Sequence, residues 1–214
     1  KRANQKEPLP VSTVQKIVHS TSSTTSNLMD FRFRTVCLLG FAGFLRIEEL
    51  LETRLEQVTF FEDHMKIFLP KSKTDQHRQG EHVFIAKTGT EFCPVKHTQQ
   101  FLNDANLDTQ RDKQAFLIPR LYRTKGGHRA SKCKGISYTS IRELFNKNLE
   151  EVDENFKTYC LHSLRSGGAS SAAENGISDR LISKQGRWAS EKSRNRYIKD
   201  TKRSRMSVTL NLGV

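Results

Sequence analysis

Residues 161–169 read Leu-His-Ser-Leu-Arg-Ser-Gly-Gly-Ala, at the start of a predicted helix rich in small residues. His162 and Arg165 lie three positions apart, so in a helix their side chains share one face. That face is close to the helix N-terminus, where backbone N–H groups also favour an anion. The Gly-Gly-Ala sequence lets another backbone or a ligand approach closely. A His-x-x-Arg motif is common, so its meaning depends on the rest of the chain.

A second candidate segment runs from Gly186 to Ile198. It contains Trp188, the only tryptophan, and nine residues later Tyr197, within a strongly basic stretch. A tyrosine in such a place is often only a packing residue. Surrounding positive charge nevertheless favours the phenolate, which is the form that a tyrosine nucleophile needs.

The third candidate segment is Gly43-Phe44-Leu45-Arg46-Ile47-Glu48-Glu49-Leu50. Arg46 falls at a break in an apolar helical stretch, where an arginine is costly unless it is paired or used. Glu49 lies one helical turn further on and can hold the guanidinium in place. A plain structural ion pair remains an alternative interpretation of these two residues.

Hydrophobic spacing predicts one mostly helical α+β domain with a small antiparallel three-stranded sheet. We expect the strands at 58–61, 65–69 and 82–86. Helices are expected at 12–19, 28–42, 45–51, 94–106, 141–150, 161–174, 179–185 and 190–199, with Ser12, Ser140, Ser178 and Ser190 as caps. Residues 108–136 are basic and contain glycine, and they predict an irregular segment.

The charge of the chain points to a polyanionic partner. Lys and Arg number 36 against 23 Asp and Glu, which gives a net charge of +13. Two blocks, residues 111–147 and 180–205, each carry ten basic residues against two acidic ones. A charged face assembled from both blocks would suit nucleic acid, although a pair of solvated loops is the plainer alternative.

Several classes of protein and site are disfavoured. No apolar run approaches the roughly 20 residues needed to span a bilayer, and four scattered cysteines do not make a disulfide framework. Cys93 and His97 lack a second pair of ligands at zinc-finger spacing. The sequence also lacks a tight acidic cluster for Mg²⁺. We therefore expect no metal site, no cofactor and no membrane partner, and chemistry on nucleic acid would have to be metal-free.

The order and spacing of these segments resemble the tyrosine recombinases of the phage-integrase type. That family carries an arginine in a GxRxxEL-like segment, a lysine in a β-hairpin loop, His-x-x-Arg, then His or Trp, and finally Tyr. The resemblance covers about Pro8 to Tyr197. The matching positions in this chain are Arg46, Lys73, His162, Arg165, Trp188 and Tyr197, with Lys71 as the second choice for the hairpin lysine.

The resemblance implies DNA breakage and rejoining without metal or ATP. Tyr197 would attack a DNA phosphate and form a covalent 3′-phosphotyrosine, releasing a 5′-hydroxyl. His162 would assist proton transfer and phosphate binding, and Lys73 would protonate the leaving 5′ oxygen.

The phosphate itself would be held by other residues. The resemblance implies that Arg46 and Arg165 clamp its nonbridging oxygens and that Trp188 donates its indole N–H to it. Glu49 would orient the arginines. Further contacts to double-stranded DNA are expected from Lys71, Arg187, Arg194 and Arg196.

The resemblance also implies a larger assembly. Residues 1–214 would form the catalytic domain, with the family's N-terminal core-binding domain absent from this chain. Residues 208–214 are mildly apolar and resemble the segment that docks onto a neighbouring protomer, so a tetrameric synapse on DNA is expected.

Finer features are similar to recombinases of eukaryotic mobile elements of the Crypton, Ngaro and DIRS type. They are the segments Ser72-Lys73-Thr74-Asp75-Gln76 and Cys93-Pro94-Val95. This likeness implies a role in integration or transposition and a nuclear location. Two alternatives stay open, namely a domesticated DNA-binding module without catalysis and a type IB topoisomerase.

Overall fold

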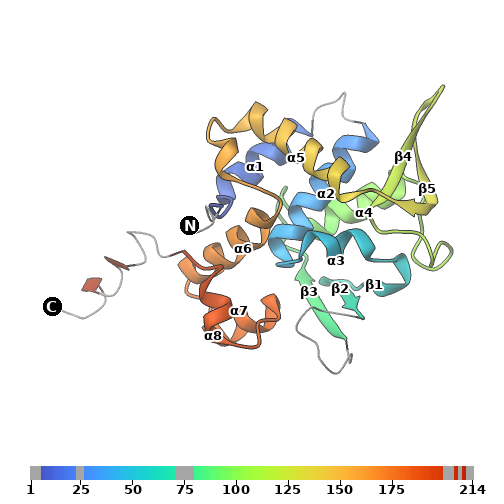
Figure 1. Cartoon of the computed structure of the whole chain (residues 1–214). Coiled ribbons are helices and arrows are strands. Elements are labelled where there is room, and N and C mark those ends of the chain that lie inside the picture. The colour runs from blue at the N-terminus through green and yellow to red at the C-terminus, as the bar shows by residue number, and fades with distance from the viewer. Residues whose placement is uncertain (1–5, 23–26, 71–79, 200–204, 207–208, 211–214) are drawn as a thin grey trace.

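The computed structural model describes residues 6–22, 27–70, 80–199, 205–206 and 209–210 (Figure 1). Helices predominate and the strands are short, which confirms the predicted α+β class. The helices are α1 (Val11–Ser20), α2 (Leu28–Ala42), α3 (Ile47–Glu52), α4 (Pro94–Asp104), α5 (Tyr138–Val152), α6 (His162–Glu174), α7 (Asp179–Gly186) and α8 (Glu191–Asn195), with 3-10 turns η1 (Leu55–Gln57) and η2 (Phe156–Thr158).

Helix α2 forms the centre of the molecule, packed against α4 and α6 (Figure 1). Its residues Val36, Cys37 and Leu39 are completely buried, and the bounds agree with the sequence prediction. Asn27 caps the helix because its side chain accepts a hydrogen bond from the backbone N–H of Met29. Such a cap stabilises a helix by about 1 kcal/mol.

A three-stranded antiparallel sheet covers one side of this core. Its strands are β1 (Val58–Phe60), β2 (His64–Leu69) and β3 (Glu81–Ala86), in the order β1-β2-β3. Ile67 lies opposite Val58 on one side and Val83 on the other, so the buried residues of all three strands share one face. Alternating burial along β2 confirms the strand prediction.

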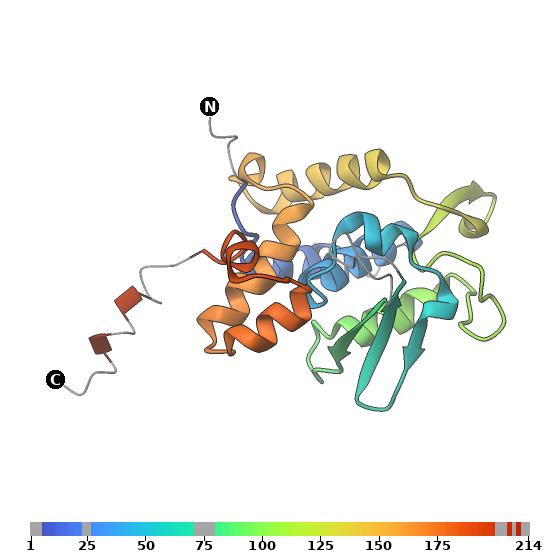
Figure 2. The ribbon, with the colours of Figure 1, turned by 60° about the horizontal axis from the view of Figure 1, so that its bottom comes forward.

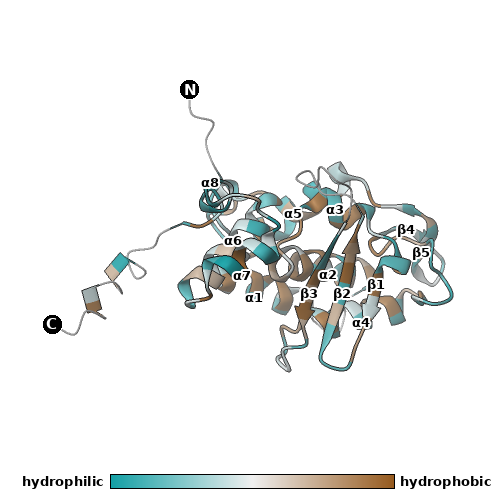
Figure 3. Cartoon of the chain, turned by 90° about the horizontal axis from the view of Figure 1, so that it is seen from below, coloured by the Kyte–Doolittle hydropathy of each residue, from teal (hydrophilic) through white to brown (hydrophobic). Residues whose placement is uncertain are grey.

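Apolar residues are concentrated in this interior. Figure 3 shows the hydrophobic colour on β2, β3 and α2, and hydrophilic colour on much of the periphery. Within the described ranges, no helix has both the length and the apolar character needed to cross a bilayer.

The prediction of an irregular segment at 108–136 is wrong. Strands β4 (Pro119–Thr124) and β5 (Gly127–Gly135) form an antiparallel hairpin there. Only a few of its residues, such as Leu121 and Ala130, pack against the core, so the apolar alternation is too weak to be seen in the sequence. A bulge between Pro119 and Leu121 disrupts the alternation further.

Three predicted helix caps need correction. Helix α1 begins at Val11 after Pro10, because Pro is suited to the first turn of a helix, and Ser12 is not the cap. Helix α5 begins three residues earlier than predicted, since Ser137 rather than Ser140 accepts the capping hydrogen bond. Ser178 precedes α7 as predicted, but its side chain makes no capping hydrogen bond.

The C-terminal helices also differ in detail. Ser190 caps α8 as predicted, accepting from the N–H of Ser193 over 3.2 Å. The helix ends at Asn195, however, and Tyr197 lies in the turn after it. Helix α7 ends where Arg187 adopts a left-handed conformation with φ of 54°.

Helix α6 approaches its neighbours closely at Gly167 and Gly168. A Cβ atom on Gly167 would lie 2.2 Å from the carbonyl oxygen of Leu9, and one on Gly168 would lie 2.1 Å from that of Phe41. Any larger residue would push α6 away from α2. The predicted role of these glycines is therefore confirmed.

Candidate active site

A small second core joins α6 to the C-terminal helices and frames the site. It is formed by Phe44, Ala169, Ile182 and Trp188, with Tyr197 packed against it. Figure 2 shows α7 and α8 lying beside α6, on the side where the chain approaches its C-terminus. This packing brings three segments that are distant in the sequence to one place.

Arg46 lies at the N-cap of α3, with an extended backbone and a half-buried side chain. Its guanidinium donates to Oε1 of Glu49 over 2.7 Å, and its backbone N–H donates to Oε2 over 3.0 Å. A carboxylate at the third helical position satisfies the N-cap amide and suits the positive end of the helix dipole. The predicted pair is thus present, and it orients the Arg46 side chain.

Glu49 binds a second arginine. Arg187 donates to its Oε2 over 2.6 Å, and the Arg187 side chain is only 1% exposed. Burial acts to raise the pKa of the Glu49 carboxyl. The charge of Arg187 and the hydrogen bonds and charge of Arg46 outweigh that effect, so this pKa lies below its ordinary value.

Arg165 is completely buried in the first part of α6. One terminal nitrogen donates to the carbonyl oxygen of Phe44 and the other to that of Gly186. Burial, followed by the charges of Arg187 and Arg46, lowers the pKa of Arg165 to about 9. This guanidinium therefore ties together the segment before α3, helix α6 and the end of α7.

The backbone around these arginines is strained. Phe44 has φ of 46° and Arg187 has φ of 54°, in the left-handed region that costs a non-glycine residue roughly 1–2 kcal/mol. The Phe44 carbonyl accepts from Arg165 and, over 3.4 Å, from Arg187. The same hydrogen bonds that hold the strained turns therefore also fix the guanidinium groups.

Two rings lie beside the Arg165 guanidinium, and a third, that of His162, lies beside Tyr197. The ring of Tyr197 lies 5.1 Å from that of His162 and 4.8 Å from that of Trp188. The guanidinium carbon of Arg165 lies 4.7 Å from the Trp188 ring centre and 5.1 Å from the Tyr197 ring centre. The Tyr197 ring thus lies beside the Arg165 guanidinium within one chain.

The environment of His162 favours its neutral form, which can accept a proton. The residue is exposed at the cavity, and partial loss of hydration there, followed by the charges of Arg165 and Arg46, lowers its pKa below the ordinary value of 6.5. The imidazole is therefore neutral at pH 7, with a free electron pair on one ring nitrogen.

The site has an excess of hydrogen-bond donors and positive charge. Three guanidinium groups, those of Arg46, Arg165 and Arg187, surround the single carboxylate of Glu49. Within the described part of the chain, the buried indole Nε1–H of Trp188 has no hydrogen-bond partner. A buried donor without an acceptor is costly, so this arrangement favours a bound anion.

A cavity of about 680 Å³ lies beside these rings. His162 and Tyr197 form part of its wall, together with Cys160, Ser166 and Arg196. The tyrosine therefore faces open space rather than the interior of the core.

Comparison with known proteins decides the family. The model of the phage integrase family matches residues 8–204. The chain belongs to the phage integrase family. A curated relative, the integrase/recombinase xerD homolog of Selenomonas ruminantium, is 32% identical to this chain over 174 residues. The match covers 80% of this chain and 48% of the relative, so the chain spans about half the length of that protein.

Solved structures of recombinases share the fold. XerA recombinase superimposes with a TM-score of 0.69 at 17% identity, over 97% of this chain and 65% of that one. XerH bound to its difH substrate gives 0.64 at 14% identity, over 99% and 56%. A lambda integrase tetramer bound to a Holliday junction gives 0.63 at 14% identity, over 94% and 50%.

Within this integrase-family domain, the structure brings together five of the six predicted catalytic residues. They are Arg46, His162, Arg165, Trp188 and Tyr197, joined by Glu49. Lys73 and Lys71 lie outside the described residues, so the prediction for the hairpin lysine stays a prediction. Arg196 is exposed at the cavity, and its predicted contact with DNA likewise stays a prediction.

Arg187 and Arg194 have buried side chains that bind carboxylates, and their predicted contacts with DNA stay predictions. Arg187 is bound in the interior by Glu49. Arg194 donates to Asp179 over 2.8 Å and its side chain is 8% exposed, so it connects α8 to α7. The sequence shows the charge of these arginines but not their burial. The acidic residues Glu49 and Asp179 were the sequence features that could have indicated partners for these two arginines.

The described residues hold no group of three or more His, Cys, Asp and Glu side chains that could bind a metal ion. Cys93 instead caps α4 by accepting from the N–H of Lys96, and the ring of His97 bonds to the Glu91 carbonyl over 2.7 Å.

Proposed function

We propose that this protein is a site-specific DNA recombinase that cuts and rejoins strands through a covalent bond between Tyr197 and a DNA 3′-phosphate. The supporting observation is the position of the Tyr197 ring beside His162, Trp188 and the Arg165 guanidinium. The XerH site-specific recombinase, which shares the fold, is bound to its difH substrate in a pre-cleavage complex, and this agrees with the proposal.

The proposed reaction is an in-line displacement at phosphorus. The phenolic oxygen of Tyr197 bonds to phosphorus as the bond to the 5′ oxygen breaks, and His162 accepts the phenolic proton. The 5′ oxygen takes a proton and leaves as a hydroxyl, for which the resemblance assigns Lys73 as the acid. Rejoining reverses these steps, so the energy of the phosphodiester is kept in the phosphotyrosine.

The arginines stabilise the charge that develops on the phosphate. Arg46 and Arg165 supply fixed guanidinium groups, and Glu49 with Arg187 holds Arg46 in position. The unpartnered Nε1–H of Trp188 would donate to one nonbridging oxygen. Groups that are held before the substrate arrives need little reorganisation during the reaction.

The decisive experiment is covalent trapping. A pool of nicked suicide duplexes of varied sequence loses a short strand after cleavage, so the phosphotyrosine adduct accumulates. We expect a protein–DNA adduct with the wild type and none with Tyr197→Phe. An adduct that persists in Tyr197→Phe would show that another residue is the nucleophile, and no adduct with either protein would favour a DNA-binding module without catalysis.

A second assay separates strand exchange from relaxation alone. A recombinase joins two sites on one plasmid into new products, whereas a type IB topoisomerase only relaxes supercoils. The likeness to a lambda integrase tetramer on a Holliday junction supports exchange within a tetramer on DNA, which we propose for the intact protein.

We further propose that the protein serves integration or transposition of a eukaryotic mobile element and acts in the nucleus. The support is the sequence likeness at residues 72–76 and 93–95 to recombinases of the Crypton, Ngaro and DIRS type. Expression of a tagged protein in eukaryotic cells tests the location, since the proposal requires nuclear accumulation.

A further inference from the structure

The β4–β5 hairpin is the most positively charged element outside the active site. Its residues 119–135 include six Lys and Arg and no Asp or Glu. All six are at least partly exposed, and they are Arg120, Arg123, Lys125, Arg129, Lys132 and Lys134. These like charges repel one another. They are therefore stabilised either by acidic side chains of the protein or by a polyanionic partner.

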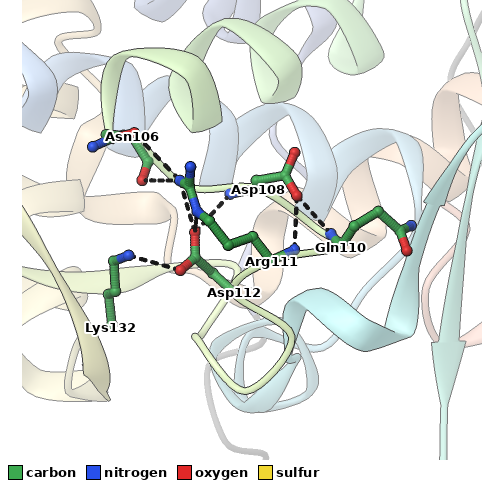
Figure 4. Close-up of polar contacts among 6 residues, drawn as sticks. All are labelled: Asn106, Asp108, Gln110, Arg111, Asp112 and Lys132. Carbon is green, nitrogen blue, oxygen red and sulfur yellow. Dashed lines mark hydrogen bonds and ion pairs between the residues drawn. The ribbon is translucent and has the colours of Figure 1, made fainter.

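Only one of these six cations is used within the described part of the protein. Lys132 donates to Asp112 over 2.7 Å, and Arg111 binds the same carboxylate over 3.1 Å (Figure 4). The hydrogen bond from Lys132 is the main reason that the pKa of Asp112 falls to about 2. This network braces the root of the hairpin against residues 106–112.

The remaining five side chains make no hydrogen bond or ion pair with any described residue. Arg129 lies opposite Tyr122, which is 49% exposed, and Arg123 lies opposite His128. At the tip, a Cβ atom added to Gly126 or Gly127 would meet nothing within 4 Å. The far end of the hairpin therefore stands clear of the protein, as Figure 1 shows.

The root of the hairpin is connected to the active site. Leu117, which precedes β4, donates to the carbonyl of Thr53 at the end of α3 over 2.8 Å. Helix α3 has six residues and is thus about 9 Å long, and its other end holds Arg46. A six-residue strand adds roughly 20 Å. The tip therefore lies on the order of one turn of duplex, roughly 34 Å, from Arg46, where the phosphate is proposed to bind.

We propose that the β4–β5 hairpin is a DNA-binding ribbon that contacts the duplex beside the cleaved phosphate. A two-stranded ribbon fits the major groove, which is about 12 Å wide, and its unpaired cations suit the phosphates along the groove. This inference rests on the proposed function, since it takes the duplex to be bound at Arg46 and Arg165.

The salt dependence of DNA binding tests the ribbon. Binding is measured with Tyr197→Phe protein, which cannot form an adduct, and a fluorescent duplex of arbitrary sequence. The triple variant Arg123→Gln, Lys125→Gln, Arg129→Gln should bind more weakly at low salt. The slope of log K against log salt should become less steep by about 2.7, since each lost phosphate contact removes about 0.9.

A matched variant controls for the loss of overall charge. Lys16→Gln, Lys96→Gln and Lys147→Gln remove three exposed charges from α1, α4 and α5. The proposal requires this control to keep the parent slope. An unchanged slope in the hairpin variant, or an equal change in the control, would overturn it.

A thiol on the hairpin gives an independent measurement. Cys133 is exposed, whereas Cys37 and Cys93 are buried, so Cys160→Ser leaves Cys133 as the reactive thiol. Saturating duplex should slow its alkylation by iodoacetamide several-fold. If duplex DNA leaves the alkylation rate of Cys133 unchanged, the hairpin does not bind DNA. This conclusion would hold even if the wild-type protein forms the covalent adduct that the recombinase proposal requires. If duplex DNA protects Cys133 but the wild-type protein forms no covalent adduct, the DNA-binding ribbon is supported and the proposed catalysis is rejected.

Discussion

Arg187 donates to Glu49 over 2.6 Å through a side chain that is only 1% exposed, and the same carboxylate holds Arg46. A residue that the sequence marks as a surface cation is therefore an interior support of the active site. Its left-handed backbone, with φ of 54°, directs the side chain inward from the end of α7.

Glu49→Gln tests this relationship. The change leaves the buried guanidinium of Arg187 and the half-buried one of Arg46 without their carboxylate, and breaking a buried pair in this way costs about 3 kcal/mol. We expect a lower urea midpoint and a loss of adduct formation, since Arg46 is no longer held. Glu48→Gln makes the same chemical change at an exposed position of the same helix, and its stability should stay within about 0.5 kcal/mol of the wild type.

A double-mutant cycle measures the pair directly. Arg187→Gln and Glu49→Gln should be coupled by about 1–3 kcal/mol, because each removes the partner of the other. Arg180 is exposed on α7, the helix that Arg187 ends, so Arg180→Gln should show no coupling to Glu49→Gln. Independent effects of the two buried changes would reject the support role of Arg187.

His162 predicts a pH dependence of stability. Its unfolded pKa is about 6.5, and partial loss of hydration, together with the charges of Arg165 and Arg46, lowers the folded pKa. Above pH 6.5 the imidazole of His162 is neutral in both the folded and the unfolded state, so it does not lower the free energy of unfolding. Below pH 6.5 the unfolded state binds the proton first, and stability falls until the pH passes the folded pKa.

Urea unfolding at pH 7.5 and pH 5.5 checks this sign. The loss of stability on acidification should be smaller in His162→Gln than in the wild type. His82 on strand β3 offers the same substitution as a control, His82→Gln, which should lose as much stability as the wild type. Equal losses in all three proteins would mean that His162 is not held neutral.

Much of the fold could be predicted because its apolar residues recur at regular intervals. Helix α2 and the strands β1 to β3 bury one consistent set of side chains, so their periodicity shows in the sequence. The β4–β5 hairpin could not be found in this way, since it buries little and its alternation is broken by a bulge.

The site was predicted by order and resemblance rather than by local pattern. No single motif shows that Tyr197 meets Arg165, because that contact depends on how α6, α7 and α8 pack around Trp188. The burial of Arg187 and Arg194 could not be predicted for the same reason. Their carboxylate partners lie 138 and 15 residues away, and only the folded chain brings the charges together.

Arg165→Lys separates binding from cleavage. An ammonium keeps the positive charge but cannot reach both the Phe44 and Gly186 carbonyls or present a planar fork to a phosphate. We expect a stability loss of about 1.5–3 kcal/mol from the lost charged hydrogen bond. DNA binding should remain close to that of the wild type, measured under conditions where the variant is folded, whereas adduct formation should be strongly reduced. Equal cleavage by Arg165→Lys would reject the clamp.

Trp188→Phe isolates the indole donor. The Nε1–H is buried without a partner in the described structure, so its removal takes away an unsatisfied group, while Phe keeps the ring against Tyr197. If this donor binds the phosphate in the transition state, its loss should lower the rate of adduct formation roughly 10²-fold. The rate is followed by single-turnover trapping, with circular dichroism showing that the variant is folded.

The control for that substitution is Tyr122→Phe, which also removes one aromatic donor but from the exposed hairpin. Its single-turnover rate at saturating DNA should equal that of the wild type, because Tyr122 lies away from the reacting phosphate. A Trp188→Phe protein that cleaves at the wild-type rate would show that the indole only packs against Tyr197 and Phe44. The arginines alone would then donate hydrogen bonds to the phosphate.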